Sequence, residues 1–93
     1  MSSVTFVANI RYNNPKSFKV TIPRDLVGMI RSTHPSLKFL EKVRVEMESR
    51  SFELDYPLLA KGSGTSHYVL INSQTIRDND IKGDEPINVV VQW

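Results

Sequence analysis

One local pattern occurs twice in this chain, and the repeat constrains the fold more than any other feature. Residues 18–30 alternate apolar and polar side chains and then place apolar side chains at helical spacing. This change of period predicts a strand that runs directly into a short helix. Residues 68–76 repeat the change, with Val69 in the position that Val20 has in the first copy. The sequence therefore predicts two similar halves, neither of which can bury its apolar face alone.

Alternating apolar runs elsewhere in the chain complete this prediction. The expected strands are residues 4–12, 17–22, 43–47, 52–59, 68–71 and 87–91, and the expected helices are residues 24–32 and 73–79. Each half then has the order strand, strand, helix, strand, over residues 4–48 and 52–93. Closing six strands about a twofold axis would remove their unpaired edges. We expect a mainly β fold, a six-stranded pseudo-twofold barrel of two ββαβ units with two short helices, as one domain over residues 1–93.

Gly28 interrupts the first expected helix. Glycine inside a helix costs about 1 kcal/mol relative to alanine. A conspicuous glycine in so short a helix indicates the close approach of another backbone.

The composition is that of an ordinary globular domain. The chain has 40% hydrophobic and 24% charged residues and no cysteine, which excludes disulfides, thiolate catalysis and cysteine-built metal sites. No apolar run approaches the roughly 18 residues that a membrane helix needs, and the first residues lack the basic start of a signal peptide. We expect a cytoplasmic protein with no membrane partner, present as a monomer or a homodimer.

Positive charge is concentrated in the first half of the chain. Residues 1–50 contain nine Lys or Arg and four Asp or Glu, a net charge of +5, whereas residues 51–93 contain three and six, a net charge of −3. A basic half suits a polyanionic partner, and it equally suits a solvated surface or attraction between the two halves. The candidate nucleic-acid-binding residues are Arg11, Lys19, Arg24, Arg31 and Arg44.

Two short motifs resemble those of a known group of folds. Val20-Thr21-Ile22-Pro23-Arg24-Asp25-Leu26 is similar to the strand–proline–helix segment of AbrB-type transcription factors, and Ile81-Lys82-Gly83-Asp84 resembles the Gly-Asp box of cradle-loop β-barrels, the group that also includes double-psi barrels. Nearly the whole chain resembles a family of uncharacterised single-chain bacterial barrels. The first half has Leu40-Glu41-Lys42 where a second Gly-Asp box would stand. The AbrB-type resemblance implies binding of double-stranded DNA, with Arg24 and Arg11 as the first candidates.

A glycine-rich segment offers an alternative site. Lys61, Gly62, Ser63 and Gly64 form a loop between two expected strands, and the acidic half of the chain surrounds them. No Gly-Lys-Ser/Thr sequence follows, so this is not a phosphate-binding loop. The loop suits a protein or small-ligand interaction module of unknown role. Its Gly-Ser bond also resembles the self-processing site of the double-psi enzyme aspartate decarboxylase.

The sequence offers little support for catalysis or metal binding. A metal site would have to bring His34 and His67 together with Asp78 or Asp80, whereas solvated histidines and turn-capping acids explain the same residues. No serine is placed beside a histidine and a carboxylate, so we select no catalytic residue. We expect a non-enzymatic binding module without a metal or other cofactor, which binds DNA or, alternatively, a protein or small ligand.

Overall fold

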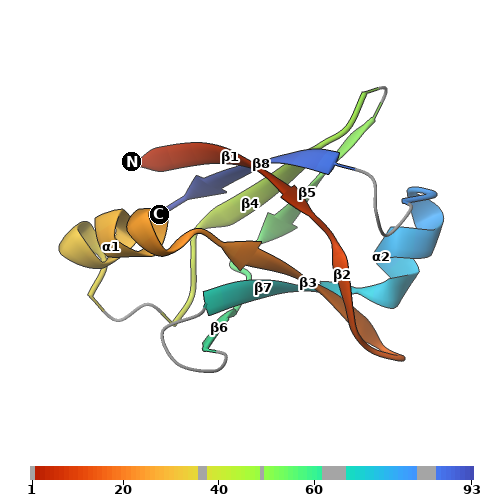
Figure 1. The fold of residues 1–93 in the computed structure, drawn as a ribbon, viewed down its shortest axis with the longest axis horizontal. Helices are drawn as coiled ribbons and strands as arrows, with labels where there is room; N and C mark the ends of the chain where they lie inside the picture. The colour runs from red at the N-terminus through yellow and green to blue at the C-terminus, as the bar shows by residue number, and fades with distance from the viewer. Residues whose placement is uncertain (1, 36–37, 49, 62–66, 82–85) are drawn as a thin grey trace.

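The computed structural model consists mainly of β-strands with two short helices (Figure 1), as the sequence predicted. It describes residues 2–35, 38–48, 50–61, 67–81 and 86–93. Within these residues the strands are β1 (Ser3–Asn9), β2 (Arg11–Asn14), β3 (Ser17–Ile22), β4 (Lys42–Glu46), β5 (Ser51–Asp55), β6 (Leu59–Lys61), β7 (His67–Asn72) and β8 (Pro86–Gln92). The helices are α1 (Arg24–Thr33) and α2 (Ser73–Asp78).

The strands form two antiparallel sheets of four strands each. Sheet A has the order β1-β8-β4-β5, and sheet B has the order β2-β3-β7-β6. Among the described residues, β1 does not pair with β5 and β2 does not pair with β6, so each sheet keeps two edges. The expectation of a closed six-stranded barrel is therefore wrong, because the described strands number eight and form two open sheets.

The higher strand count arises because two of the expected strands are each bent into two. The run of residues 4–12 is interrupted at Ile10, which lies between β1 in sheet A and β2 in sheet B. The run of residues 52–59 is interrupted at Tyr56, whose φ of 51° lies in the left-handed region and turns the chain before Pro57. Each bent strand thus passes from one sheet to the other instead of extending a single barrel wall.

Alternating aliphatic side chains from both sheets form the core. In sheet B, β3 and β7 bury Val20 and Val69, which lie directly opposite each other in the antiparallel ladder. In sheet A, β4 and β8 bury Val45 and Val89 in the same arrangement. Branched side chains suit these positions because their stiff χ1 fits the pleated surface. Ile10, at the junction of β1 and β2, is fully buried between these layers.

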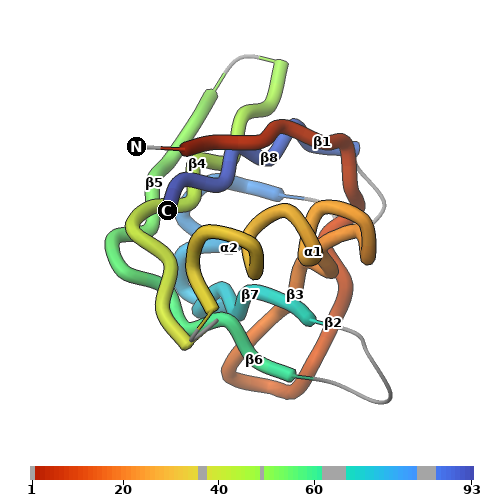
Figure 2. The backbone as a smooth tube through the Cα atoms, turned by 90° about the vertical axis from the view of Figure 1, so that its left-hand side faces the viewer, coloured from red at the N-terminus to blue at the C-terminus, as the bar shows by residue number. Residues whose placement is uncertain are grey.

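The two helices lie at opposite ends of the fold (Figure 1). Figure 2 shows α1 across the opening between sheet A and sheet B. This helix buries Val27 and Ile30, and the Trp93 indole N–H donates a hydrogen bond to the Thr33 hydroxyl in its last turn. At the other end, Asn72 caps the N-terminus of α2, because its side-chain oxygen accepts a hydrogen bond from the Gln74 N–H at 2.7 Å. Neither described helix has the length and apolar character needed to span a membrane.

Candidate nucleic-acid interface

Two of the predicted DNA-binding residues lie side by side on the outer face of sheet B. Arg11 of β2 is directly opposite Lys19 of β3 in the antiparallel ladder. The alternation of β3 buries Val20 and Ile22, so Lys19 faces away from the core. Side chains opposite each other on one face of a sheet are about 4.5–5.5 Å apart at Cβ. The hairpin register therefore brings two positive charges together.

Lys19 also contacts Tyr68, an aromatic residue that the sequence did not indicate as part of a site. Its Nζ lies 5.4 Å from the centroid of the Tyr68 ring, within the range of a cation–π contact. Tyr68 belongs to β7, where it lies opposite Thr21 of β3. The alternation of β7 around the buried Val69 indicates that Tyr68 faces outward. Its meeting with Lys19 follows only from the long-range pairing of β3 with β7.

Arg24 and Arg31 place two further positive charges on the exposed side of α1. They are seven positions apart, which places them on the same side of the helix after about two turns. Both are exposed, whereas the buried residues of the helix face the core. Arg24 begins α1 immediately after Pro23 and β3, the strand that carries Lys19. Gly28 lies between the two arginines on the same side of the helix.

Gly28 does not meet another backbone in the described fold, contrary to the expectation from the sequence. A Cβ added at this position has no neighbouring atom within 4 Å. Gly28 is exposed because it lies on the side of α1 that faces away from the core. The described fold therefore supplies no packing reason for a glycine here.

Gly28→Ala is consequently expected to stabilise the protein. Alanine fits the open space and favours the helix by about 0.5–1 kcal/mol. In a domain of this size such a change raises the melting temperature by about 2–8 °C, measurable by circular dichroism. Met29→Ala, an exposed position in the same helix, is the control, with an expected change within about 0.5 kcal/mol. A lower melting temperature for Gly28→Ala would show that the position is not open.

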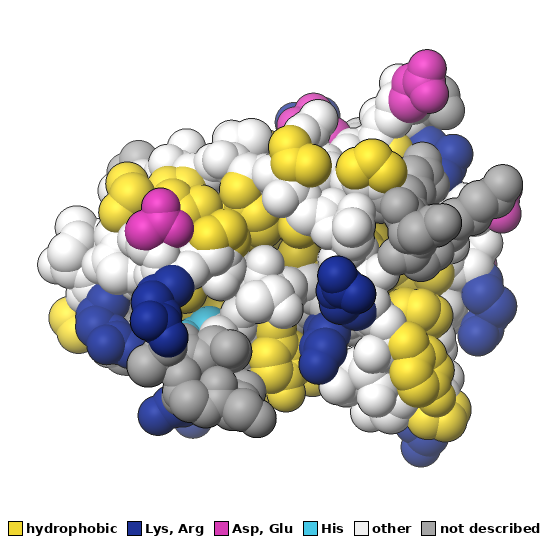
Figure 3. Space-filling model, viewed as in Figure 1, with side chains coloured by type: hydrophobic (Ala, Val, Ile, Leu, Met, Phe, Trp, Pro, Cys, Tyr) yellow, Lys and Arg dark blue, Asp and Glu magenta, His cyan; other side chains and the backbone are white. Residues whose placement is uncertain are grey.

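Charge is unevenly distributed over the surface that Figure 3 shows. Most of its Lys and Arg side chains lie in the lower part of the view, and most acidic side chains lie in the upper part. Among the described residues, no carboxylate forms an ion pair with any of the four predicted DNA-binding residues on sheet B and α1. The residues that we call the basic face are therefore not neutralised by any described carboxylate. They are Arg11, Lys19, Arg24 and Arg31.

Arg44, the fifth predicted residue, lies apart from the basic face, on β4 in sheet A. It is opposite Glu53 of β5. Nearby Lys42 contacts Glu53 at 2.9 Å and Asp55 at 3.7 Å. The hydrogen bond and charge of Glu53 raise the pKa of Lys42, and the same hydrogen bond lowers the pKa of Glu53. Acidic side chains thus balance the positive charge on this face, which makes it a weaker site for a polyanion.

The predicted ligand loop is described only at its start. Lys61 ends β6, opposite His67 of β7. Gly62, Ser63 and Gly64 lie outside the described residues, and so do the last three residues of the Gly-Asp box at residues 81–84. His67 is buried rather than solvated, because it lies on the inner face of β7. The structure therefore places only Lys61 of the four predicted loop residues.

His34 and Asp78 make local contacts. The Nε2 atom of His34 lies 2.7 Å from the Phe39 carbonyl oxygen. The Asp78 carboxylate accepts a hydrogen bond from the Gln74 side chain at 2.7 Å. Within the described ranges, no group of three or more His, Asp or Glu side chains could hold a metal ion. These contacts agree with structural roles at the ends of the helices.

The fold and the placement of its cations define a small, mainly β domain with a basic outer face. Comparison with models of protein families gives no match to the chain. Neither a curated protein nor a solved structure matches it. A function for this domain therefore has to be inferred from its own geometry and chemistry.

Proposed function

We propose that this chain is a non-enzymatic module that binds double-stranded DNA through the basic face. The proposal rests on one observation, the cross-strand pairing of Arg11 with Lys19 on the outer face of sheet B. Like charges directly opposite each other destabilise a sheet, and the phosphates of DNA would relieve this repulsion. Arg24 and Arg31 offer further phosphate contacts along α1. A DNA partner also requires an intracellular location, most simply the cytoplasm.

The proposal includes a pseudo-twofold relation between the two halves, as in the cradle-loop barrels that the sequence resembles. Strand order supports it, because exchanging β1 to β4 with β5 to β8 leaves the order of each sheet unchanged. Val20 and Val69 correspond in the sequence repeat and pair with each other in the β3–β7 ladder. Such a pairing is expected if a twofold axis passes between the two strands.

Fluorescence anisotropy of a labelled DNA duplex at several salt concentrations tests the proposed function. We expect binding at low salt that weakens steeply as salt is added. The reason is that Lys and Arg side chains release counterions when they bind the phosphates, and added salt opposes this release. Four phosphate contacts would lower the affinity by about a hundredfold between roughly 50 and 200 mM salt. A single strand of the same sequence is the control for the duplex. Absence of binding at low salt, or binding that salt does not weaken, would reject the proposal.

A further inference from the structure

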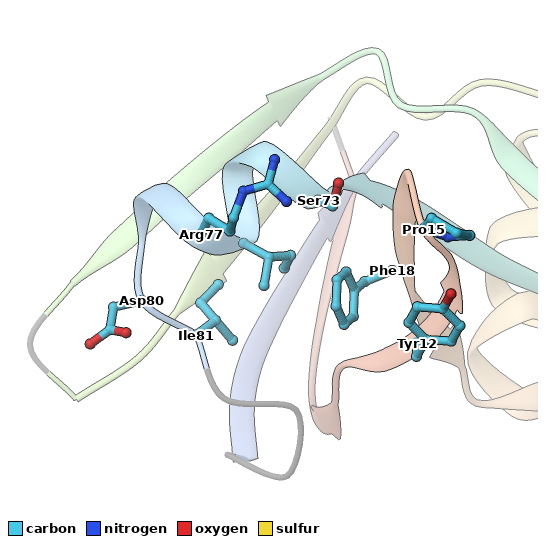
Figure 4. A pocket seen from close by; sticks show the side chains of 8 residues that line it. Tyr12, Pro15, Phe18, Ser73, Arg77, Asp80 and Ile81 are labelled. Carbon is cyan, nitrogen blue, oxygen red and sulfur yellow. The ribbon is translucent and has the colours of Figure 1, made fainter.

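A cleft at the α2 end of the fold lies outside the basic face. It separates the tip of the β2–β3 hairpin from α2 and the turn that follows it (Figure 4), and its volume is about 460 Å³. Tyr12 and Phe18 line it from the hairpin, and Ile76, Arg77 and Ile81 line it from the other side. Clefts of this size accept small molecules of one or two rings.

Hydrogen bonds in the β2–β3 hairpin and around α2 hold both walls of the cleft in place. The Asn14 side chain accepts a hydrogen bond from the Lys16 N–H at 2.8 Å and thereby fixes the hairpin tip. The Lys16 carbonyl accepts from the Ser73 N–H at 3.0 Å, which joins the hairpin to α2. On the opposite wall, the Ile81 N–H donates to the Ile76 carbonyl at 3.1 Å. The cleft is therefore formed before any ligand arrives, which lowers the cost of binding.

Tyr12 provides an aromatic surface in this cleft. Its ring meets Phe18 edge-on, with ring centroids 5.8 Å apart and an interplanar angle of 87°. This geometry uses the edge of one ring and leaves a face of the pair free to stack with another ring. Although Tyr12 belongs to the alternating run that forms the core, it remains 62% exposed. An exposed aromatic side chain beside apolar walls favours a flat, apolar part of a ligand.

Arg77 gives the same cleft a positive charge. Its Nη2 donates to the neutral Gln74 side-chain oxygen at 2.9 Å, and no described carboxylate forms an ion pair with it. Asp78 is already bonded to the Gln74 amide nitrogen. Figure 4 shows that Asp80, the acidic residue in the lining, points away from the aromatic pair. An anionic group in the cleft would therefore meet an Arg77 side chain that has no ion pair with a described carboxylate.

Ser73 adds a second polar group to the lining. The residue is only 8% exposed. Its hydroxyl has no hydrogen-bond partner in the part of the chain that the structure describes. The oxygen is not among the buried unpaired atoms of the described residues, so water reaches it, and a polar ligand atom in the cleft would take the place of that water.

We infer that this cleft binds a small molecule that combines a planar aromatic ring with an anionic group. The ring packs against Tyr12 and the isoleucine wall, and the anion pairs with Arg77. Nucleotides and aromatic carboxylates both supply this chemistry. The site does not depend on DNA binding, because Tyr12 and Arg11 are successive residues of β2 and point to opposite faces of the strand.

Two-dimensional ¹H–¹⁵N NMR with defined probes tests the inference. The probes are adenosine 5′-monophosphate and indole-3-acetate, and the controls are adenosine, which has no anion, and inorganic phosphate, which has no ring. Each probe is added up to about 10 mM, where even a millimolar site fills. We expect at least one of the two anionic probes to shift the amide signals of Tyr12, Phe18 and Arg77, with weaker shifts from either control.

Two variants separate the ring contact from the charge contact. Arg77→Gln is expected to weaken binding of the anionic probe by about tenfold, as loss of a charged hydrogen bond implies, and to leave adenosine unaffected. Tyr12→Leu keeps apolar bulk but removes the aromatic face, so it should weaken every ring-containing probe. Arg24→Gln, the same change on the other helix, is the matched control and should have no effect.

The results show whether the cleft is a binding site and which of the two classes of ligand it accepts. Binding of only the nucleotide or only the carboxylate, with sensitivity to Arg77→Gln, supports the inference and identifies the ligand class. The inference is overturned if neither anionic probe shifts the cleft signals. It is also overturned if Arg77→Gln and Arg24→Gln weaken binding equally. The affinity for the anionic probe would then depend on the net charge of the protein and not on a contact with Arg77.

Discussion

Replacing Arg11 and Arg24 with alanine is expected to weaken binding to double-stranded DNA by about five- to thirtyfold, because exposed ion contacts contribute about 0.5–1 kcal/mol each. The double variant removes one cation from each part of the basic face, because Arg11 lies on β2 in sheet B and Arg24 lies on α1. The salt dependence should also become shallower, by about 0.9 in the logarithmic slope for each lost phosphate contact. Fluorescence anisotropy at several salt concentrations measures both quantities.

The matched control removes the same amount of positive charge from sheet A. Lys42 and Arg44 lie on β4, opposite Asp55 and Glu53 of β5. Lys42→Ala with Arg44→Ala is therefore expected to change DNA affinity by no more than about twofold. Circular dichroism confirms that both double variants fold. Equal losses of affinity in the two variants would mean that only net charge matters, and the basic face would not be the DNA site.

Local apolar patterns predicted most of the strands and both helices. β3 has the predicted bounds, Ser17–Ile22. α1 begins at Arg24, directly after Pro23, because proline lacks the N–H that a first helical turn leaves unpaired. These features depend on hydrophobic period and turn chemistry among neighbouring residues, and the sequence contains that information directly.

The paths of the two bent strands could not be predicted in the same way. Residues 4–12 alternate without a break through Ile10, and only the partners of β1 and β2 reveal that these strands belong to different sheets. A change of partner leaves no mark on the sequence, because the apolar spacing continues to Tyr12 although Tyr12 is 62% exposed in the fold. The second bend occurs at Tyr56, whose left-handed backbone is uncommon for a bulky residue, so the sequence does not indicate it.

The candidate sites divide along the same line between local and long-range information. The pairing of Arg11 with Lys19 follows from a short hairpin, and the spacing of Arg24 and Arg31 follows from the helix. Arg44 was grouped with them by charge alone, and its separation depends on the pairing of β4 with β5 and β8. The cleft at α2 was not predicted, because its two walls are about sixty residues apart in the chain.

Ile10→Ala is expected to destabilise the protein by about 2–5 kcal/mol, as large-to-small core substitutions do. Native domains are stable by only about 5–15 kcal/mol, so this loss is a large part of the total. Ile10 is fully buried at the junction between sheet A and sheet B. Hydrogen bonds from β1 to β8 and from β2 to β3 fix the backbone on both sides, so the cavity can collapse only partly. Urea unfolding followed by Trp93 fluorescence measures the loss.

The control for this variant is Val7→Ala, on β1 but with a side chain that points to solvent. Val7 is 68% exposed, so its replacement should change the free energy of unfolding by no more than about 0.5 kcal/mol. If the two sheets unfold as one cooperative unit, Ile10→Ala lowers the urea midpoint of a single transition and leaves its slope unchanged. Two separate transitions would mean that the sheets unfold independently. Equal effects of Ile10→Ala and Val7→Ala would contradict the packing of the junction, because a fully buried side chain cannot be removed as cheaply as an exposed one.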